Sequence, residues 1–248
     1  REMGTTTHRN PLLSFLLLLS LLSFPISAQE KVGAFPRRLL AVTIHGYMYA
    51  NPLHSGESDG TLDEQKRTGT DAVVRRLGER WRVPKDQHYH LSDALTLAEL
   101  EAKDTKDEKP KTLPLKGIIE GTIEKFLSSS RAQDRIVFMF CGHALERAGE
   151  VYFVPLEGDF EDLKTLIPLK WLHEKFAACK AQEKIIIYDV CRFHPERRAI
   201  RAQAGPMSAA LEKALHGSPE GVTVLTTCSK GEHAYESDYA YSKTMNIS

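Results

Sequence analysis

Residues 135–143 read RIVFMFCGH, an unbroken apolar run that ends in a cysteine, a glycine and a histidine. Residues 184–192 (KIIIYDVCR) form a second run of the same kind, which ends in an aspartate and a cysteine. Strands that are apolar at every position, rather than at alternate ones, are covered on both faces, as in a parallel sheet between two layers of helices. These two stretches therefore predict buried parallel strands with polar side chains at their carboxyl ends.

The rest of the chain alternates between strand-like and helix-like patterns. Further apolar runs of strand length occur at 38–44, 88–91, 151–154 and 222–226. Segments with apolar residues at helical spacing are found at 62–81, 115–126, 169–179 and 207–215. The highly charged stretch 99–111 is expected to be a solvated loop. The alternation predicts one α/β domain, with a Rossmann-like, mostly parallel sheet flanked by helices on both faces.

The composition is that of a globular protein. The chain has 248 residues, of which 42% are hydrophobic and 27% charged, enough for one domain with a sizeable core. Its 33 basic and 33 acidic residues give no net charge, which argues against a nucleic-acid partner. Four cysteines without a CxxC pair exclude a small disulfide-stapled fold and a zinc ribbon.

The first 28 residues are expected to be a signal peptide. His8 and Arg9 precede the apolar run 12–24, and Ser27 and Ala28 are small residues suited to cleavage. A membrane-spanning helix needs about 20 apolar residues, so this run is short for a span. The alternative is an uncleaved membrane anchor. We expect a secreted or periplasmic protein with no membrane partner after the leader is removed.

Ligands of such sheets bind beyond the carboxyl ends of the strands, where His143 and Cys191 follow the two most apolar runs. A thiol needs a base to act as a nucleophile near neutral pH, because the thiolate is the reactive form. Either residue alone is more often structural, but together they predict a catalytic pair. The chain has neither a GxGxxG nor a GxxxxGK[ST] motif to support nucleotide binding. It also has no HExxH motif or carboxylate spacing that would predict a metal site.

The residues around this pair resemble caspase-like cysteine peptidases. FMFCGHA around His143 resembles their strand-Gly-His block, and IIYDVCR around Cys191 resembles their Asp-x-Cys block, with the histidine about 50 residues before the cysteine. The resemblance is metacaspase-like and bacterial in character, and it extends over 37–248, the expected catalytic domain. The chain ends where the family continues into another helix and strand, which leaves open whether this domain is truncated at its C-terminus.

By this resemblance, Cys191 is the nucleophile that attacks a peptide carbonyl and His143 is its general base. The N–H of Cys191, with another at Gly142 or Ala144, would hold the oxyanion. The family has glycine where this chain has Ala144. If that position needs a positive φ, alanine would be strained. The alternative function is therefore an impaired pseudopeptidase that acts as a protein-binding or scaffolding module.

Asp71 and Asp189 match the positions where metacaspase-like enzymes place two carboxylates in the pocket for the residue before the scissile bond. A carboxylate pair favours a guanidinium or ammonium group, so the resemblance implies cleavage after Arg or Lys. Cys141, where the family often has serine, is expected to affect the floor of this pocket. The alternatives are a solvated helix carboxylate for Asp71 and a structural, hydrogen-bonding aspartate at a strand end for Asp189.

No cofactor is expected, although some metacaspases bind calcium and Asp159, Glu161 and Asp162 form an acidic cluster that leaves this ion open. The expected partner is a peptide or protein substrate. The sequence leaves the oligomeric state open.

Overall fold

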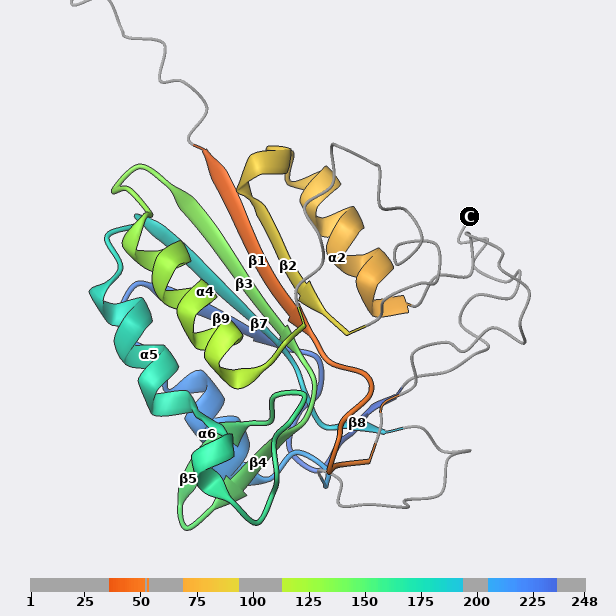
Figure 1. Cartoon of the computed structure of the whole chain (residues 1–248). Coiled ribbons are helices and arrows are strands. Elements are labelled where there is room, and N and C mark those ends of the chain that lie inside the picture. The colour runs from red at the N-terminus through yellow and green to blue at the C-terminus, as the bar shows by residue number, and fades with distance from the viewer. Residues whose placement is uncertain (1–35, 52, 54–68, 94–112, 194–204, 236–248) are drawn as a thin grey trace, which may run out of the picture. The chain divides into compact units, whose positions relative to one another are not determined.

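The computed structural model describes residues 36–51, 53, 69–93, 113–193 and 205–235 (Figure 1). The expected signal peptide and the charged stretch 99–111 lie outside the described residues. The described residues belong to one compact unit that begins at Pro36. No helix in this part of the chain is long and apolar enough to span a bilayer.

The centre of the fold is a five-stranded parallel sheet with the strand order β2-β1-β3-β7-β9. Its strands are β1 (Arg37–Thr43), β2 (His88–Ser92), β3 (Arg135–Cys141), β7 (Glu183–Asp189) and β9 (Val222–Thr226). Each of these strands was expected from its apolar run. The prediction of an α/β domain with a mostly parallel sheet between helices is confirmed.

Helices cover both faces of the sheet (Figure 1). One face carries α4 (Lys116–Ser128), α5 (Leu169–Ala178) and α6 (Ala209–His216), and the other carries α2 (Gly69–Arg80). All four helices coincide with expected helical segments, although residues 62–68 of the first are not described and α6 ends one residue beyond the expected 207–215. The helix at 115–126 runs two residues further than expected, to Ser128.

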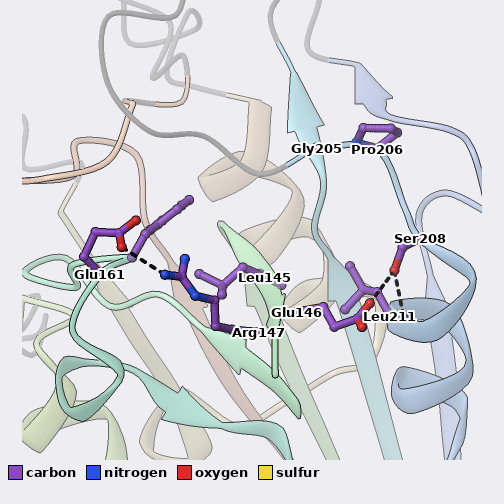
Figure 2. Close-up of a pocket in the computed structure, with 10 residues that line it drawn as sticks. Leu145, Glu146, Arg147, Glu161, Gly205, Pro206, Ser208 and Leu211 are labelled. Carbon is purple, nitrogen blue, oxygen red and sulfur yellow. Dashed lines mark hydrogen bonds and ion pairs between the residues drawn. The ribbon is translucent and has the colours of Figure 1, made fainter. Parts of the chain in front are cut away.

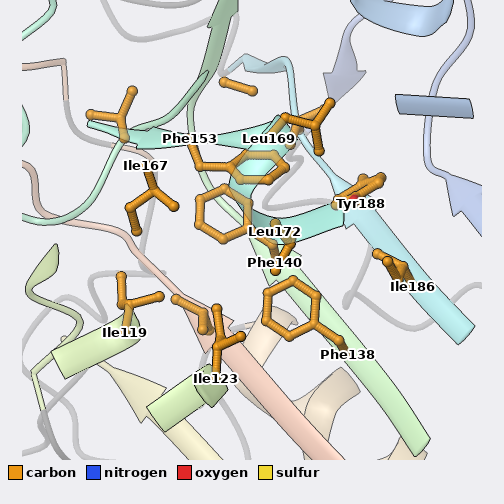
Figure 3. Packing of buried hydrophobic residues seen from close by; sticks show 14 of the residues in the cluster. Ile119, Ile123, Phe138, Phe140, Phe153, Ile167, Leu169, Leu172, Ile186 and Tyr188 are labelled. Carbon is orange, nitrogen blue, oxygen red and sulfur yellow. The ribbon is translucent and has the colours of Figure 1, made fainter. Parts of the chain in front are cut away.

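The packing explains why β3 is apolar at successive positions. Phe138 and Phe140 belong to the larger core cluster, beside residues of α4 and α5 (Figure 3). Val137 and Met139 point the other way and form a smaller cluster with Val74 of α2. Because each face has its own helical cover, neither set of side chains is left in water.

The strand β9 departs from the expectation of full burial. It lies at one edge of the sheet, and its side chains alternate between partly buried and exposed. Leu225 is 52% exposed. Its register partner Ile187 packs with the small cluster under α2, so the described part of α2 does not extend across β9.

A second, antiparallel sheet follows β3 directly. It consists of β4 (Ala144–Arg147), β5 (Glu150–Phe153) and β6 (Ile167–Pro168), in that order. The two residues between β4 and β5, Ala148 and Gly149, both have positive φ, as a two-residue hairpin turn requires. Of these strands, only β5 was expected from the sequence, because β4 and β6 are short and lack an apolar pattern. A short parallel pair, β8 (Arg192–Phe193) and β10 (Ala234–Tyr235), was also missed.

Candidate active site

The register of the sheet brings the expected site residues to one edge. Thr43, Cys141 and Asp189 are partners at the ends of β1, β3 and β7, on strands about 4.8 Å apart. The N–H of Gly142 donates to the carbonyl of Asp189 at 3.1 Å, which continues the pairing beyond both strands. His143 and Cys191 therefore follow adjacent strands, each two residues past the aligned pair.

The imidazole of His143 is held in one tautomer. Its Nε2 lies 2.7 Å from the carbonyl oxygen of Asn51. A carbonyl only accepts hydrogen bonds, so Nε2 carries the proton and Nδ1 carries the lone pair of the neutral ring. His143 is 1% exposed, and Nδ1 has no hydrogen-bond partner in the described part of the chain. Nδ1 is therefore the atom of this ring that can accept a proton.

Tyr47 fixes the backbone beneath this imidazole. The N–H of His143 donates to the Tyr47 hydroxyl at 2.6 Å, and the two rings stack with their centroids 4.6 Å apart. A Cβ at Gly142 would lie 2.5 Å from the same hydroxyl and 3.1 Å from the Phe140 ring. Glycine precedes the histidine because the tyrosine approaches the backbone so closely.

Cys191 is buried and turns the chain sharply. The residue is fully buried and adopts a φ of 58°, in the left-handed region. Its carbonyl accepts the N–H of Ala234 at 3.1 Å. Burial raises the pKa of its thiol to about 12, and the neighbouring thiol of Cys228 adds to this shift. None of the four cysteines, all of which lie in the described ranges, forms a disulfide.

The two residues do not form an ion pair in this structure. Burial lowers the pKa of His143 to about 4, although the hydrogen bond to Asn51 opposes the shift. Because the pKa of the Cys191 thiol is raised, the pair consists of a neutral imidazole and a neutral thiol near pH 7. Among the described contacts, no hydrogen bond joins His143 to Cys191. At rest, both side chains are therefore uncharged, and the two residues follow adjacent strands.

The backbone at Ala144 is not strained. Ala144 begins β4 and is absent from the residues with positive φ, so the strain considered for alanine at this position does not arise. Val154 donates to the carbonyl of His143 at 3.0 Å, which makes Ala144 and Phe153 a non-hydrogen-bonded pair. The N–H of Ala144 therefore points away from β5, whereas that of Gly142 is already used. Ala144 is the better oxyanion donor of the two.

Asp71 lies in a polar cluster on the α2 face of the sheet. Its carboxylate accepts hydrogen bonds from Thr43 at 2.8 Å and Ser92 at 3.1 Å. Nε2 of His90 lies 3.4 Å, and that of His45 3.6 Å, from Asp71 Oδ1. Burial by itself would raise the pKa of Asp71, but the two imidazoles hold it well below its usual range. Asp71 therefore stays ionised.

Asp189 and Cys141 lie on the same face as Asp71. Asp189 is 7% exposed and accepts a hydrogen bond from the Thr227 hydroxyl at 2.9 Å. The Cys141 thiol is fully buried and contacts the Thr70 hydroxyl at 3.8 Å. Since Cys141 pairs with Thr43 on one side and Asp189 on the other, the two carboxylates lie on either side of it.

The acidic cluster at 159–162 has structural partners. Asp159 accepts the N–H of Glu161 at 2.9 Å, and Asp162 caps a short 3-10 helix by accepting the N–H of Lys164 at 3.0 Å. Glu161 pairs with Arg147 at 2.9 Å. No group of three or more metal-ligating side chains occurs within the described ranges.

No protein-family model matches the chain, and no curated protein matches its sequence.

The sequence did not predict the roles of Tyr47, Asn51 and His90 in the site. Tyr47 and Asn51 act on His143 through a hydroxyl and a backbone carbonyl, and neither contact leaves a pattern in the chain. His90 precedes Ser92 by two residues and shares its face of β2. That face is defined only by the pairing of β2 with β1, which the sequence does not reveal.

The buried imidazole predicts a pH-dependent stability. The pKa of His143 is about 4 in the folded protein and about 6.5 in the unfolded chain, which therefore takes up a proton first as the pH falls. The free energy of unfolding should drop between pH 6.5 and 4, by roughly 3 kcal/mol from this residue. Urea denaturation of the wild type and of His143→Gln at several pH values measures the difference. Identical pH profiles for the two proteins would contradict this assignment.

Proposed function

We propose that this protein is a caspase-like cysteine endopeptidase of metacaspase character. Cys191 is the nucleophile, His143 the base, and peptide bonds after Arg or Lys are the substrate. The observation that carries the proposal is the buried, unpartnered Nδ1 of His143, held by Asn51 at the end of the strand next to the one that leads to Cys191. With residues 1–28 as the expected signal peptide, the proposed enzyme would act outside the cytoplasm.

The reaction divides between the two side chains. Nδ1 of His143 takes the thiol proton as the sulfur of Cys191 attacks the carbonyl carbon of the substrate. The carbonyl oxygen becomes an oxyanion, for which the N–H groups of Ala144 and Cys191 are the candidate donors. His143 then gives its proton to the leaving amine as the C–N bond breaks. Water hydrolyses the resulting thioester, and the thiol is restored.

The resting state sets a condition on this mechanism. A fully buried thiol with a raised pKa is a poor nucleophile, and the imidazole has a lowered pKa. Substrate binding must therefore open the site and bring the thiol to Nδ1. An imidazole of low pKa remains an unprotonated base even in mildly acidic solution, so hydrolysis would persist well below pH 6.

The preference for a basic residue rests on the two carboxylates. Asp71 and Asp189 are both ionisable groups with little exposure, on one face of the sheet. A guanidinium or ammonium group of the substrate would be attracted to them, and an acidic side chain would be repelled. Nε2 of His45 and of His90 lies within 3.6 Å of Asp71 Oδ1, whereas Asp189 accepts a hydrogen bond from the Thr227 hydroxyl.

Hydrolysis of matched peptides tests the proposal. Three internally quenched peptides that differ only in Arg, Lys or Asp before the scissile bond are incubated with the protein, with calcium and with a chelator. We expect cleavage after Arg and Lys and none after Asp. Cleavage after Asp would contradict the two-carboxylate pocket, and no cleavage of any peptide would contradict the peptidase proposal.

A pseudopeptidase that binds proteins is the second candidate, because Cys191 is fully buried and protonated at rest. The two candidates differ in their response to a peptidyl chloromethyl ketone that ends in arginine. A peptidase should bind this probe as a substrate and alkylate Cys191, with a matching increase in mass. A pseudopeptidase should react no faster with it than with iodoacetamide, which makes no substrate contacts.

A further inference from the structure

A cavity of about 370 Å³ adjoins the candidate active site (Figure 2). Its walls come from strand β4, from the loop at Phe160 and Glu161, from the segment before α6 and from the first turn of α6. The lining residues of these segments are Ala144, Leu145, Glu146, Arg147, Phe160, Glu161, Gly205, Pro206, Ser208 and Leu211. The cavity therefore extends along β4, the strand that begins directly after His143.

Two of the lining residues connect the cavity to the imidazole. Ala144 follows His143 in the chain and directs its N–H away from β5. The ring of Phe160 meets the His143 ring edge to face, with centroids 6.0 Å apart. A molecule in this cavity would pass beside the candidate base and the candidate oxyanion donor.

The strand β4 can pair with an extended peptide. In the antiparallel ladder with β5, the pairs Ala144–Phe153 and Glu146–Val151 are the non-hydrogen-bonded ones, since they alternate along the strand. The N–H and C=O groups of Ala144 and Glu146 therefore point away from β5. In the described part of the chain β4 pairs with β5 alone, and its other edge borders the cavity.

The side chains at this edge already have partners on either side of the strand. Glu146 accepts a hydrogen bond from Ser208 at 3.0 Å, and Arg147 pairs with Glu161 at 2.9 Å (Figure 2). The charged groups of Glu146 and Arg147 are thus bonded to other residues that line the cavity. The N–H and C=O of Glu146 and the C=O of Ala144, which have no backbone partner among the described residues, are therefore the polar groups suited to an incoming strand.

We propose that this cavity binds the part of the substrate that follows the scissile bond, as an extended strand paired with β4. The inference rests on the proposed peptidase function and adds a subsite to it. The leaving amine must take its proton from His143, so the chain beyond the scissile bond passes the imidazole. In the proposed function, the substrate residue before the scissile bond binds at Asp71 and Asp189, on the α2 face of the sheet. The cavity beside β4 receives the other half of the substrate.

Peptides of two lengths test this subsite. Both carry the same residues up to an arginine, and continue with either one or four alanines before a C-terminal amide. Product formation is followed by chromatography. We expect kcat/KM to be at least ten-fold higher for the longer peptide. Equal values for the two peptides in the wild type would overturn the subsite while the peptidase proposal stands.

The variant Glu146→Pro removes an N–H that faces the cavity without taking a hydrogen bond from the β4–β5 ladder. Glu146→Ala is the matched control, because it loses the same side chain and keeps the N–H. We expect Glu146→Pro to lose the advantage of the longer peptide and to cut the shorter one within about two-fold of the wild type. Glu146→Ala should retain the advantage.

Two outcomes would overturn the inference in different ways. If the ratio of kcat/KM for the longer and the shorter peptide is the same in Glu146→Pro as in Glu146→Ala, the backbone of β4 does not bind the substrate. If the wild type cuts neither peptide, the proposed function fails and the subsite falls with it. Thermal unfolding followed by circular dichroism shows whether Glu146→Pro is folded. Should it be unfolded, the two peptide lengths in the wild type decide the question alone.

Discussion

Cys191→Ala is expected to reduce peptide hydrolysis to background, a loss of about a thousand-fold or more, because no other group can form the thioester. Hydrolysis of the arginine peptide is measured over hours at high protein concentration, so that a rate lowered by this factor can still be detected. Cys179→Ala is the matched control. Its thiol is also buried, but Cys179 follows the end of α5 and its thiol contacts the carbonyl of Leu127 in α4 instead of the site.

His143→Ala should have a similar effect, and the double variant should lose little more than either single one, since nucleophile and base act as a unit. Both side chains are buried, so a modest loss of stability is expected as well and is measured by urea denaturation. Full activity of Cys191→Ala, or additive losses in the double variant, would contradict the proposed pair.

Asp189→Asn is expected to lower kcat/KM for the arginine peptide by roughly ten- to a hundred-fold, because a charged hydrogen bond contributes about 1.5–3 kcal/mol. Asp71→Asn should act in the same direction, although it also removes the partner of His45 and His90. The measurement is kcat/KM for peptides with arginine and with uncharged norleucine before the scissile bond.

Comparing the two substrates shows whether an aspartate variant loses recognition of arginine or loses the folded structure of the site. Loss of a carboxylate from a binding pocket should weaken cleavage after arginine far more than cleavage after norleucine. Asp86→Asn, at an exposed turn before β2, serves as the control and should alter neither. An equal loss for both peptides would show that the aspartates stabilise the fold and do not bind the substrate.

Much of the fold could be predicted from local patterns. The strands β3 and β7 are apolar at consecutive positions because they lie between two helical layers, and each layer supplies its own hydrophobic contacts. The same runs show where the strands end, and hence that His143 and Cys191 follow two carboxyl ends. Short strands such as β4 could not be found in this way, because their pairing stabilises them and their composition does not reveal it.

The state of the candidate site depended on contacts between segments far apart in the chain. The tautomer of His143 follows from the carbonyl of Asn51, and its backbone is held by Tyr47. Whether Ala144 was strained depended on its φ, which is set by the pairing of β4 with β5. The ionisation of Asp71 depends on two histidines from β2 and from the loop after β1. Residue types and spacing thus indicate which groups reach the edge of the sheet, whereas protonation and orientation depend on burial and hydrogen-bond partners that only the folded chain brings together.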